Sequence, residues 1–203
     1  MINVGIVVYT GVDEIEAFAP YDILSSCKSS AQGHWTDDAA FQVTLIGDRK
    51  LPVKSSHDVS IIPQRPLVNF DNLNIVIVPG GPGARLQKYP DSLLDWLGRA
   101  QSSAKMVVSL SSAAFIFARA GMLKNRRIAV YPAFAPDIRR IEPQATVVAN
   151  EPIVLDGNSF LSTNSISVSV DATLALISLF EGQDSANIAS RRIGWTRKVE
   201  IVK

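Results

Sequence analysis

A serine at the end of a buried strand is the first candidate for chemistry in this sequence. Residues 105–110 form a mostly apolar run that predicts a buried strand, and Ser111 follows it directly. A nucleophile on a sharp strand-to-helix turn needs small residues two positions before and after it, and Ser109 and Ala113 meet that need. The following helix would direct its amino-terminal amides at the same point. The same pattern also fits an ordinary turn in which serine caps a helix, so both interpretations stay open.

A glycine-rich turn, residues 79–83, is the second candidate. It follows another apolar run at 74–78 and contains the adjacent pair Gly80 and Gly81. Adjacent glycines let backbone amides come close to a ligand or to a developing oxyanion. The spacing matches neither a phosphate-binding loop nor a dinucleotide fingerprint. An oxyanion-binding loop and a plain tight turn are both compatible with it.

Glu16 is the third candidate, because Pro20 follows it by one helical turn. A proline at position 20 cannot donate a hydrogen bond to the carbonyl of residue 16, so we expect a helix that is kinked or that begins late, at Glu16. Asp13 precedes Glu16 with the spacing of a capping box. Glu16 could carry a proton or act as a hydrogen-bond clamp. The alternative is a solvent-facing acid in a first helical turn.

Cysteine and histidine are scarce. Cys27 is the only cysteine, which excludes an intrachain disulfide. It falls on the apolar stripe of the first predicted helix, about three turns from Glu16, and we expect it to be buried and packed. His34 and His57 are the only histidines. We therefore expect neither a metal nor an organic cofactor.

The predicted elements alternate between strands and helices, and most strands are apolar on both faces. This pattern indicates an α/β sandwich with a largely parallel sheet. The predicted strands are 2–9, 41–47, 74–78, 105–110 and 128–131, with a hairpin of 153–155 and 160–163 around an Asp-Gly-Asn turn. The predicted helices are one starting near residue 13, then 93–100, 115–120, 136–141 and 168–180, with a last one after Gly182; residues 28–40 are expected to be a polar loop or a short insertion.

Length and charge exclude several classes of protein. At roughly 150 residues per domain, 203 residues predict a single domain over 1–203. The hydrophobic fraction of 47% excludes disorder, and 20 Lys and Arg against 19 Asp and Glu leave no basic field for nucleic acid. No apolar run approaches the roughly 20 residues that cross a bilayer, and the amino terminus lacks a signal peptide. We expect a cytoplasmic protein that binds neither membranes nor nucleic acid.

Taken together, these motifs resemble the ThiJ/PfpI superfamily, which is related to class I glutamine amidotransferases. The resemblance extends from Ile2 to about Arg192 and is greatest for the isocyanide hydratase and regulator-like branch. Matching residues are Gly11, Glu16 and Pro20 in the first segment and Phe115, Ala118, Ala120, Gly121 and Leu123 after the strand-to-helix turn. The resemblance implies a flavodoxin-like three-layer α/β sandwich with a mostly parallel sheet.

The resemblance also implies roles for four residues. Glu16 corresponds to the acidic residue that hydrogen-bonds the nucleophile, and it is expected to be protonated. Gly80 and Gly81 correspond to the loop on the oxyanion side. Ser112 would supply the amide that follows the nucleophile.

The sequence departs from the family where the chemistry would occur. The family nucleophile is a cysteine, and Ser111 stands at its position. Tyr131 stands where many members have a histidine, and residues 162–165 replace a Thr-Ser-Ala-Gly run. Part of a cysteine side chain is ionised near neutral pH, whereas serine is not and needs a positioned base. Tyr131 is a poor base unless its environment shifts its pKa strongly.

Two functions follow from these observations. The first is a catalytically degenerate member that binds a small molecule or a partner in the ancestral pocket. The second is a hydratase or hydrolase in which Ser111 is the nucleophile and Glu16 carries the proton. The resemblance further implies a homodimer packed near the strand-to-helix turn and the first helix.

Overall fold

The structure is a computed structural model that describes residues 1–31, 34–67, 72–86, 89–197 and 201–202. Its centre is an eight-stranded sheet in the order β14-β12-β13-β9-β8-β1-β4-β7. The strands are β1 Ile2–Val7, β4 Phe41–Gly47, β7 Arg65–Pro66, β8 Ile75–Val78, β9 Met106–Ser109, β12 Ile153–Asp156, β13 Phe160–Thr163 and β14 Ile201–Val202. Within this sheet only the β12–β13 hairpin pairs antiparallel. The predicted mostly parallel sheet and the predicted hairpin are confirmed.

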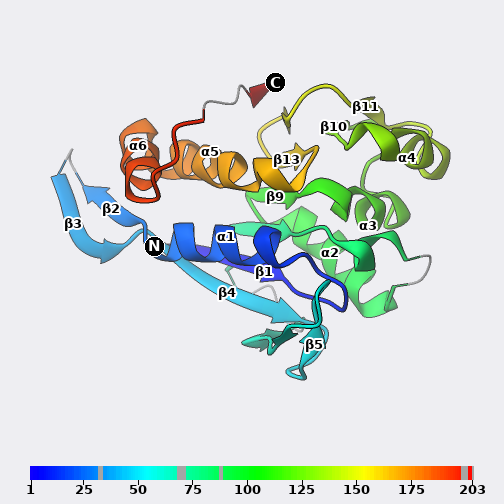
Figure 1. The fold of residues 1–203 in the computed structure, drawn as a ribbon, viewed down its shortest axis with the longest axis horizontal. Coiled ribbons are helices and arrows are strands. Elements are labelled where there is room, and N and C mark those ends of the chain that lie inside the picture. Colours follow the sequence, from blue (N-terminus) through cyan, green and yellow to red (C-terminus); the bar gives the residue numbers. More distant parts are fainter. Residues whose placement is uncertain (32–33, 68–71, 87–88, 198–200, 203) are drawn as a thin grey trace.

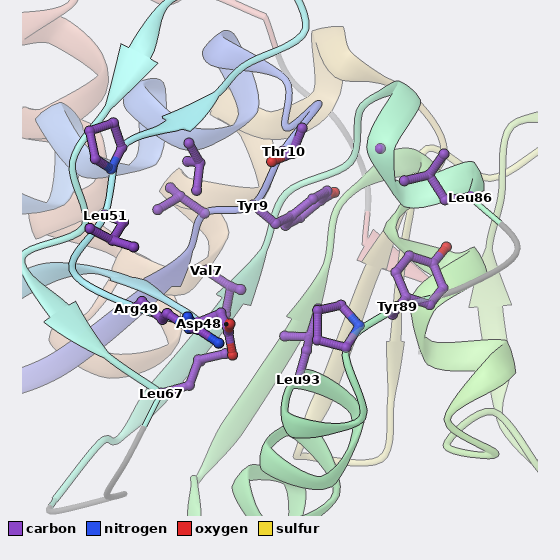
Figure 2. Close-up of a pocket in the computed structure, with 15 residues that line it drawn as sticks. Val7, Tyr9, Thr10, Asp48, Arg49, Leu51, Leu67, Leu86, Tyr89 and Leu93 are labelled. Carbon is purple, nitrogen blue, oxygen red and sulfur yellow. Dashed lines mark ion pairs between the residues drawn. The ribbon is translucent and has the colours of Figure 1, made fainter.

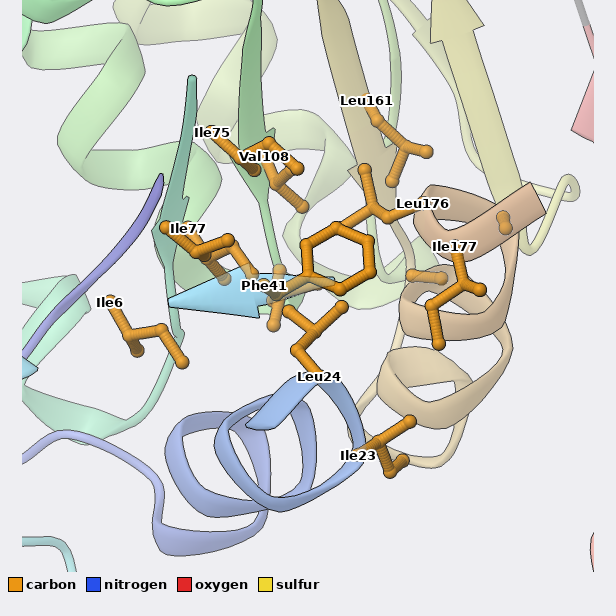
Figure 3. Packing of buried hydrophobic residues seen from close by; sticks show 14 of the residues in the cluster. Ile6, Ile23, Leu24, Phe41, Ile75, Ile77, Val108, Leu161, Leu176 and Ile177 are labelled. Atoms are coloured by element: carbon orange, nitrogen blue, oxygen red, sulfur yellow. The ribbon is translucent and has the colours of Figure 1, made fainter. Parts of the chain in front are cut away.

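Helices cover both faces of the sheet, which gives three layers (Figure 1). They are α1 Glu14–Ser25, α2 Asp91–Ser103, α3 Ala114–Arg119, α4 Ala135–Ile141, α5 Ser169–Glu181 and α6 Gln183–Arg192. On one face Leu24 of α1 and Leu176 of α5 pack against Phe41 (Figure 3). On the other, Trp96 of α2 and Phe117 of α3 are buried against the sheet. No helix among the described residues has the length and apolar character needed to span a bilayer.

Strand β8 shows why an apolar run predicted a central strand. Ile75 and Ile77 point into the core beneath α1 and α5, whereas Val76 and Val78 point into the core beneath α2 and α3. Alternate side chains of a strand point to opposite faces, so a strand covered on both sides must be apolar throughout. The parallel pairing of β8 with β1 and β9 then brings the carboxyl ends of three strands to one edge. The candidate residues of the sequence lie at that edge.

Residues 28–40, which were expected to be a loop or a short insertion, are an insertion with regular structure. Lys28–Ala31 (β2) and His34–Ala39 (β3) form an antiparallel two-stranded sheet. The side chain of Lys28 adds a hydrogen bond from Nζ to the carbonyl oxygen of Asp37, at 2.7 Å. A two-stranded ribbon outside the main sheet satisfies its backbone without an apolar face, so its polar sequence carried no strand signal.

Three other boundaries differ from the expectation. The helix α1 does not begin late at Glu16: it begins at Glu14 and accommodates Pro20 in its interior. The strand predicted at 128–131 is β10 Arg127–Ala129, and it pairs with β11 Thr146–Val148 in a separate two-stranded sheet. Between β4 and β7, β5 Val53–Lys54 and β6 Ser60–Ile61 form a short hairpin that the sequence had not indicated. Strands of two or three residues are too short to show a period.

Candidate functional site

Ser111 occupies a strained turn between β9 and α3. Its φ is +49°, in the left-handed region that residues with a Cβ rarely adopt. The Ser111 amide donates a hydrogen bond of 3.0 Å to Oγ1 of Thr163, at the end of the neighbouring strand β13. A short 3₁₀ turn, Ser111–Ala113, then leads into α3. Strain of roughly 1–2 kcal/mol is held by these contacts, as it is at many functional turns.

Glu16 lies fully buried in the first turn of α1, opposite this strained turn. The side chain of Asp13 caps the helix by accepting from the Glu16 amide at 3.1 Å. Oε2 of Glu16 accepts from the Gly80 amide at 2.5 Å, and Oε1 has no hydrogen-bond partner among the residues that the structure describes. The Asp13 cap was expected, but the Glu16 side chain reaches Gly80 instead of completing a capping box. Glu16 is therefore not a solvent-facing acid, which was the alternative interpretation of the sequence.

Burial changes the protonation of Glu16. Removal from water raises its pKa to about 8, the negative charge of Asp13 adds to this, and the Gly80 hydrogen bond and the nearby Ser111 hydroxyl oppose it. At pH 7 the carboxyl group is therefore mostly protonated. The arrangement fits Oε2 as the accepting oxygen and Oε1 as the hydroxyl that lacks an acceptor. Glu16 can donate a proton or a hydrogen bond at the Ser111 turn, but it is not a base at this pH.

The glycine loop contacts both Glu16 and the Ser111 turn. The Gly81 amide donates to Oγ of Ser112 at 2.9 Å, and the same hydroxyl is 3.1 Å from the Gly81 carbonyl oxygen. Gly81 has a φ of +126°, which only glycine adopts readily. At Gly80, a Cβ would lie 2.7 Å from both Oε2 of Glu16 and Oγ of Ser112. The two glycine amides assigned to the oxyanion side are thus already hydrogen-bonded within the chain.

Tyr9 holds the same loop from the other side, a contact that no sequence pattern indicated. Its hydroxyl lies 2.5 Å from the Pro79 carbonyl oxygen and 3.0 Å from that of Gly80. The Gly80 carbonyl also accepts from the Asp13 amide at 2.9 Å. Burial and the nearby Glu16 carboxyl raise the pKa of Tyr9 well above its ordinary value. The Tyr9 hydroxyl is therefore a permanent donor that fixes the orientation of the Gly80 peptide.

The remaining candidates are Tyr131, His34 and Cys27. Tyr131 is 46% exposed, and its ring packs edge-on against Phe134 with 5.4 Å between ring centroids. No hydrogen bond joins Tyr131 to Ser111 or Glu16 in the part of the chain that the structure describes. His34 belongs to β3, and its side chain lies outside the described positions. Cys27 is buried just beyond the end of α1, as expected, and burial raises its pKa to about 11.

His57 takes part in a cluster around Glu14 that the sequence did not predict. Oε2 of Glu14 is 2.6 Å from Oγ of Ser56 and 2.9 Å from Nδ1 of His57, while Oε1 contacts Oγ of Ser55 and the His57 amide. Burial raises the pKa of Glu14, but these hydrogen bonds outweigh it and lower the pKa. The hydrogen bond to Glu14 raises the pKa of His57. This cluster fastens the β5–β6 hairpin to the start of α1.

No group of three or more His, Cys, Asp or Glu side chains within the described residues is arranged to hold a metal ion. The polar groups at the Ser111 turn are three hydroxyls, one carboxyl group and backbone amides, and the carboxyl group is mostly protonated near neutral pH. Such a set suits hydrogen bonding to a small polar molecule better than coordination of a cation.

The fold and the turn define a class: a flavodoxin-like α/β protein with a nucleophile-type turn at the carboxyl edge of its sheet. The sequence profile of the DJ-1/PfpI family matches residues 3–178. The chain belongs to this family.

Individual relatives are distant. The isonitrile hydratase of Pseudomonas putida is 22% identical over 192 residues, which cover 95% of this chain and 78% of that protein. Protein dj-1beta of Drosophila melanogaster is 26% identical over 161 residues, covering 77% and 78% respectively. The crystal structure of Drosophila melanogaster DJ-1beta superposes with a TM-score of 0.82 at 20% identity, covering 97% of this chain and 99% of that one.

A THiJ/PfpI family protein from Pseudomonas syringae superposes similarly. Its TM-score is 0.81 at 18% identity, and the match covers 97% of this chain and 76% of that one. At such identities the likeness establishes the fold, and the predicted flavodoxin-like sandwich is confirmed.

Proposed function

We propose that this chain binds a small polar molecule at the Ser111 turn without turning it over. The observation that carries the proposal is the state of the oxyanion loop: Glu16 occupies the Gly80 amide and the Ser112 hydroxyl occupies the Gly81 amide. Amides that are already satisfied cannot stabilise a developing oxyanion unless those bonds break first. Of the three amides assigned to the oxyanion side, those of Gly80 and Gly81 are therefore not free for acyl transfer or hydration.

The lack of a base near Ser111 supports the same proposal. A serine hydroxyl needs a positioned base to become a nucleophile. Glu16 is mostly protonated at neutral pH, His57 is engaged with Glu14, and Tyr131 packs on Phe134. What remains is a hydrogen-bonding site: the buried Oε1 of Glu16, for which the described residues provide no hydrogen bond of good geometry, beside the Ser111 hydroxyl that lowers the pKa of Glu16. Buried polar atoms usually find a partner, so a bound ligand or water would complete this one.

A serine-dependent hydratase or hydrolase is the second candidate. It is favoured by the left-handed backbone of Ser111, which a simple cap would not require. In this reaction the Ser111 hydroxyl would add to an electrophilic carbon, and its proton would pass to a Glu16 carboxylate. That carboxylate is abundant only above the pKa of Glu16, about 8. The name of the Pseudomonas putida relative, isonitrile hydratase, indicates a small unsaturated substrate for this candidate.

Labelling with a fluorophosphonate separates the two functions. We expect no covalent adduct on Ser111 at pH 7 after hours of incubation, measured by intact-protein mass spectrometry. A stoichiometric adduct that is absent in Ser111→Ala, present in Ser112→Ala and faster as the pH rises through 8 would establish the second function. Ligands for the first are sought by thermal shift with small amides, nitriles and aldehydes. A ligand of this site should shift wild type but not Ser111→Ala.

We further propose that the chain forms a homodimer through the outer face of α1. Ile15 and Phe18 are large, exposed hydrophobic side chains, and their spacing places them on one side of the helix. They lie on the opposite side of the helix from the buried side chain of Glu16. We expect sedimentation at micromolar concentration to show a dimer that Phe18→Glu converts to a monomer, whereas Ile62→Glu, also exposed, leaves it unchanged. A monomeric wild type would contradict the proposal. A cytoplasmic location stays a prediction.

A further inference from the structure

A cavity of about 260 Å³ lies at the carboxyl edge of the sheet, apart from the Ser111 turn. It opens between the ends of β1 and β4 and the start of α2 (Figure 2). Its wall is mainly aliphatic and aromatic, formed in large part by Val7, Tyr9, Leu67, Leu86, Tyr89 and Leu93. Neither Glu16 nor Ser111 nor Ser112 lines it. The cavity is therefore distinct from the Ser111 turn, where we propose that the polar ligand binds.

The two tyrosines present rings to the cavity, because their hydroxyls are engaged elsewhere. Tyr9 donates to the glycine-loop carbonyls, as described. The Tyr89 hydroxyl donates to the carbonyl oxygen of Ala84 and accepts from Nη1 of Arg119 at 2.9 Å. A ligand would meet ring surface on two sides. Aromatic rings favour other aromatic rings in edge-to-face or offset geometry.

The charged groups at the rim cancel each other. Nε of Arg49 lies 3.6 Å from Oδ2 of Asp48, and Oδ1 of Asp48 accepts a hydrogen bond from Oγ of Ser92 at 2.7 Å. Both side chains line the cavity (Figure 2). A paired acid and base give no net attraction to an anion or a cation. Burying a charged group against the apolar wall would be costly, so the chemistry selects a neutral ligand.

We propose that this cavity is a second ligand site, which binds a small neutral aromatic molecule of one or two fused rings. The volume supports this size: a dry cavity of about 150 Å³ accepts benzene, and the present one is larger by roughly the space of a second ring. The proposal does not rest on the function proposed for Ser111, since Glu16, Ser111 and Ser112 do not line the cavity.

Indole is the probe that tests the proposal. We expect it to bind wild type with a Kd on the order of 1 mM or below in ligand-observed NMR. In methyl spectra of the protein, indole should shift the signals of Val7, Leu67 and Leu93 but not those of Leu179, which is exposed on α5. Indole-3-carboxylate and tryptamine, which carry opposite charges, should bind at least about tenfold more weakly. Equal binding of either charged compound would overturn the assignment to a neutral ligand.

Variants at the mouth test the location. Leu51 and Leu86 line the cavity and are 59% and 54% exposed, so Leu51→Trp and Leu86→Trp should fold normally and obstruct it. We expect each to weaken indole binding at least about tenfold. Ile62→Trp is the matched control, because Ile62 is 64% exposed and does not line the cavity. Ser111→Ala should bind indole as wild type does. Absence of binding, or binding without shifts at Val7, Leu67 and Leu93, would overturn the proposal.

Discussion

Replacing Ser111 with cysteine is expected to create a thiol that iodoacetamide alkylates at least about 100-fold faster than Cys27 at pH 7. Cys27 is buried and its pKa is raised to about 11, so its thiolate fraction is very small. At position 111 the protonated Glu16 carboxyl can donate a hydrogen bond to a thiolate, which favours ionisation. The rates are measured by mass spectrometry of digests, which distinguishes the two sites in one sample.

Two controls make this experiment decisive. The wild type contains only Cys27 and gives the background rate. Ser112→Cys places a thiol one residue further along, beside the Gly81 amide rather than at the strained position. If Ser111→Cys is alkylated no faster than the wild type, the turn does not activate the side chain at position 111 and its backbone strain does not contribute to reactivity. If Ser111→Cys and Ser112→Cys react equally fast, position 111 is not distinguished from its neighbour.

Replacing Glu16 with glutamine is expected to remove a pH dependence of stability. The pKa of Glu16 is raised to about 8 in the folded chain and is near 4.5 when unfolded. Below pH 4.5 both states are protonated and the folded chain keeps its full stability. As the pH rises from about 5 to 8, only the unfolded state releases the proton. The free energy of unfolding therefore falls, by on the order of 4 kcal/mol in total for this group.

Urea unfolding at pH 5, 6, 7 and 8 measures this effect. Glutamine keeps an oxygen for the Gly80 amide and a donor where the protonated carboxyl group has one, so Glu16→Gln should gain stability relative to wild type as the pH rises. Glu14→Gln is the control that should show no such slope between pH 5 and 8, because the pKa of Glu14 is lowered in the folded chain and its unfolded value is near 4.5. Glu14 contributes stability above its unfolded pKa and loses it as the pH falls. Parallel curves for wild type and Glu16→Gln would mean that Glu16 ionises normally.

The parts of the fold that could be predicted are those in which residues close together in the sequence determine the secondary structure. Apolar runs such as 75–78 had to be strands buried on both faces. The Ser111 turn was indicated by small residues on both sides. These features depend on steric and periodic rules that act over a few positions.

The unpredicted parts of the site depend on contacts between distant segments. Tyr9 and Gly80 are 71 positions apart, and Gly81 and Ser112 are 31 apart, so no local pattern shows that these pairs hydrogen-bond. Only the amide of Ser112 was given a role in advance, whereas its hydroxyl occupies the loop. The β2–β3 ribbon was missed because its polar residues lack the alternation that a half-buried strand requires.

The loops after β1 and β8 touch backbone to backbone beside the apolar cavity. The Gly83 amide donates to the Gly11 carbonyl at 3.0 Å, and a Cβ on Gly83 would overlap the carbonyl oxygen of Thr10. Tyr9 links this cavity to the Ser111 turn, since its ring lines the cavity while its hydroxyl binds the glycine-loop carbonyls. A change at Tyr9 would therefore affect both places, whereas changes at Leu51 or Leu86 would affect the cavity alone.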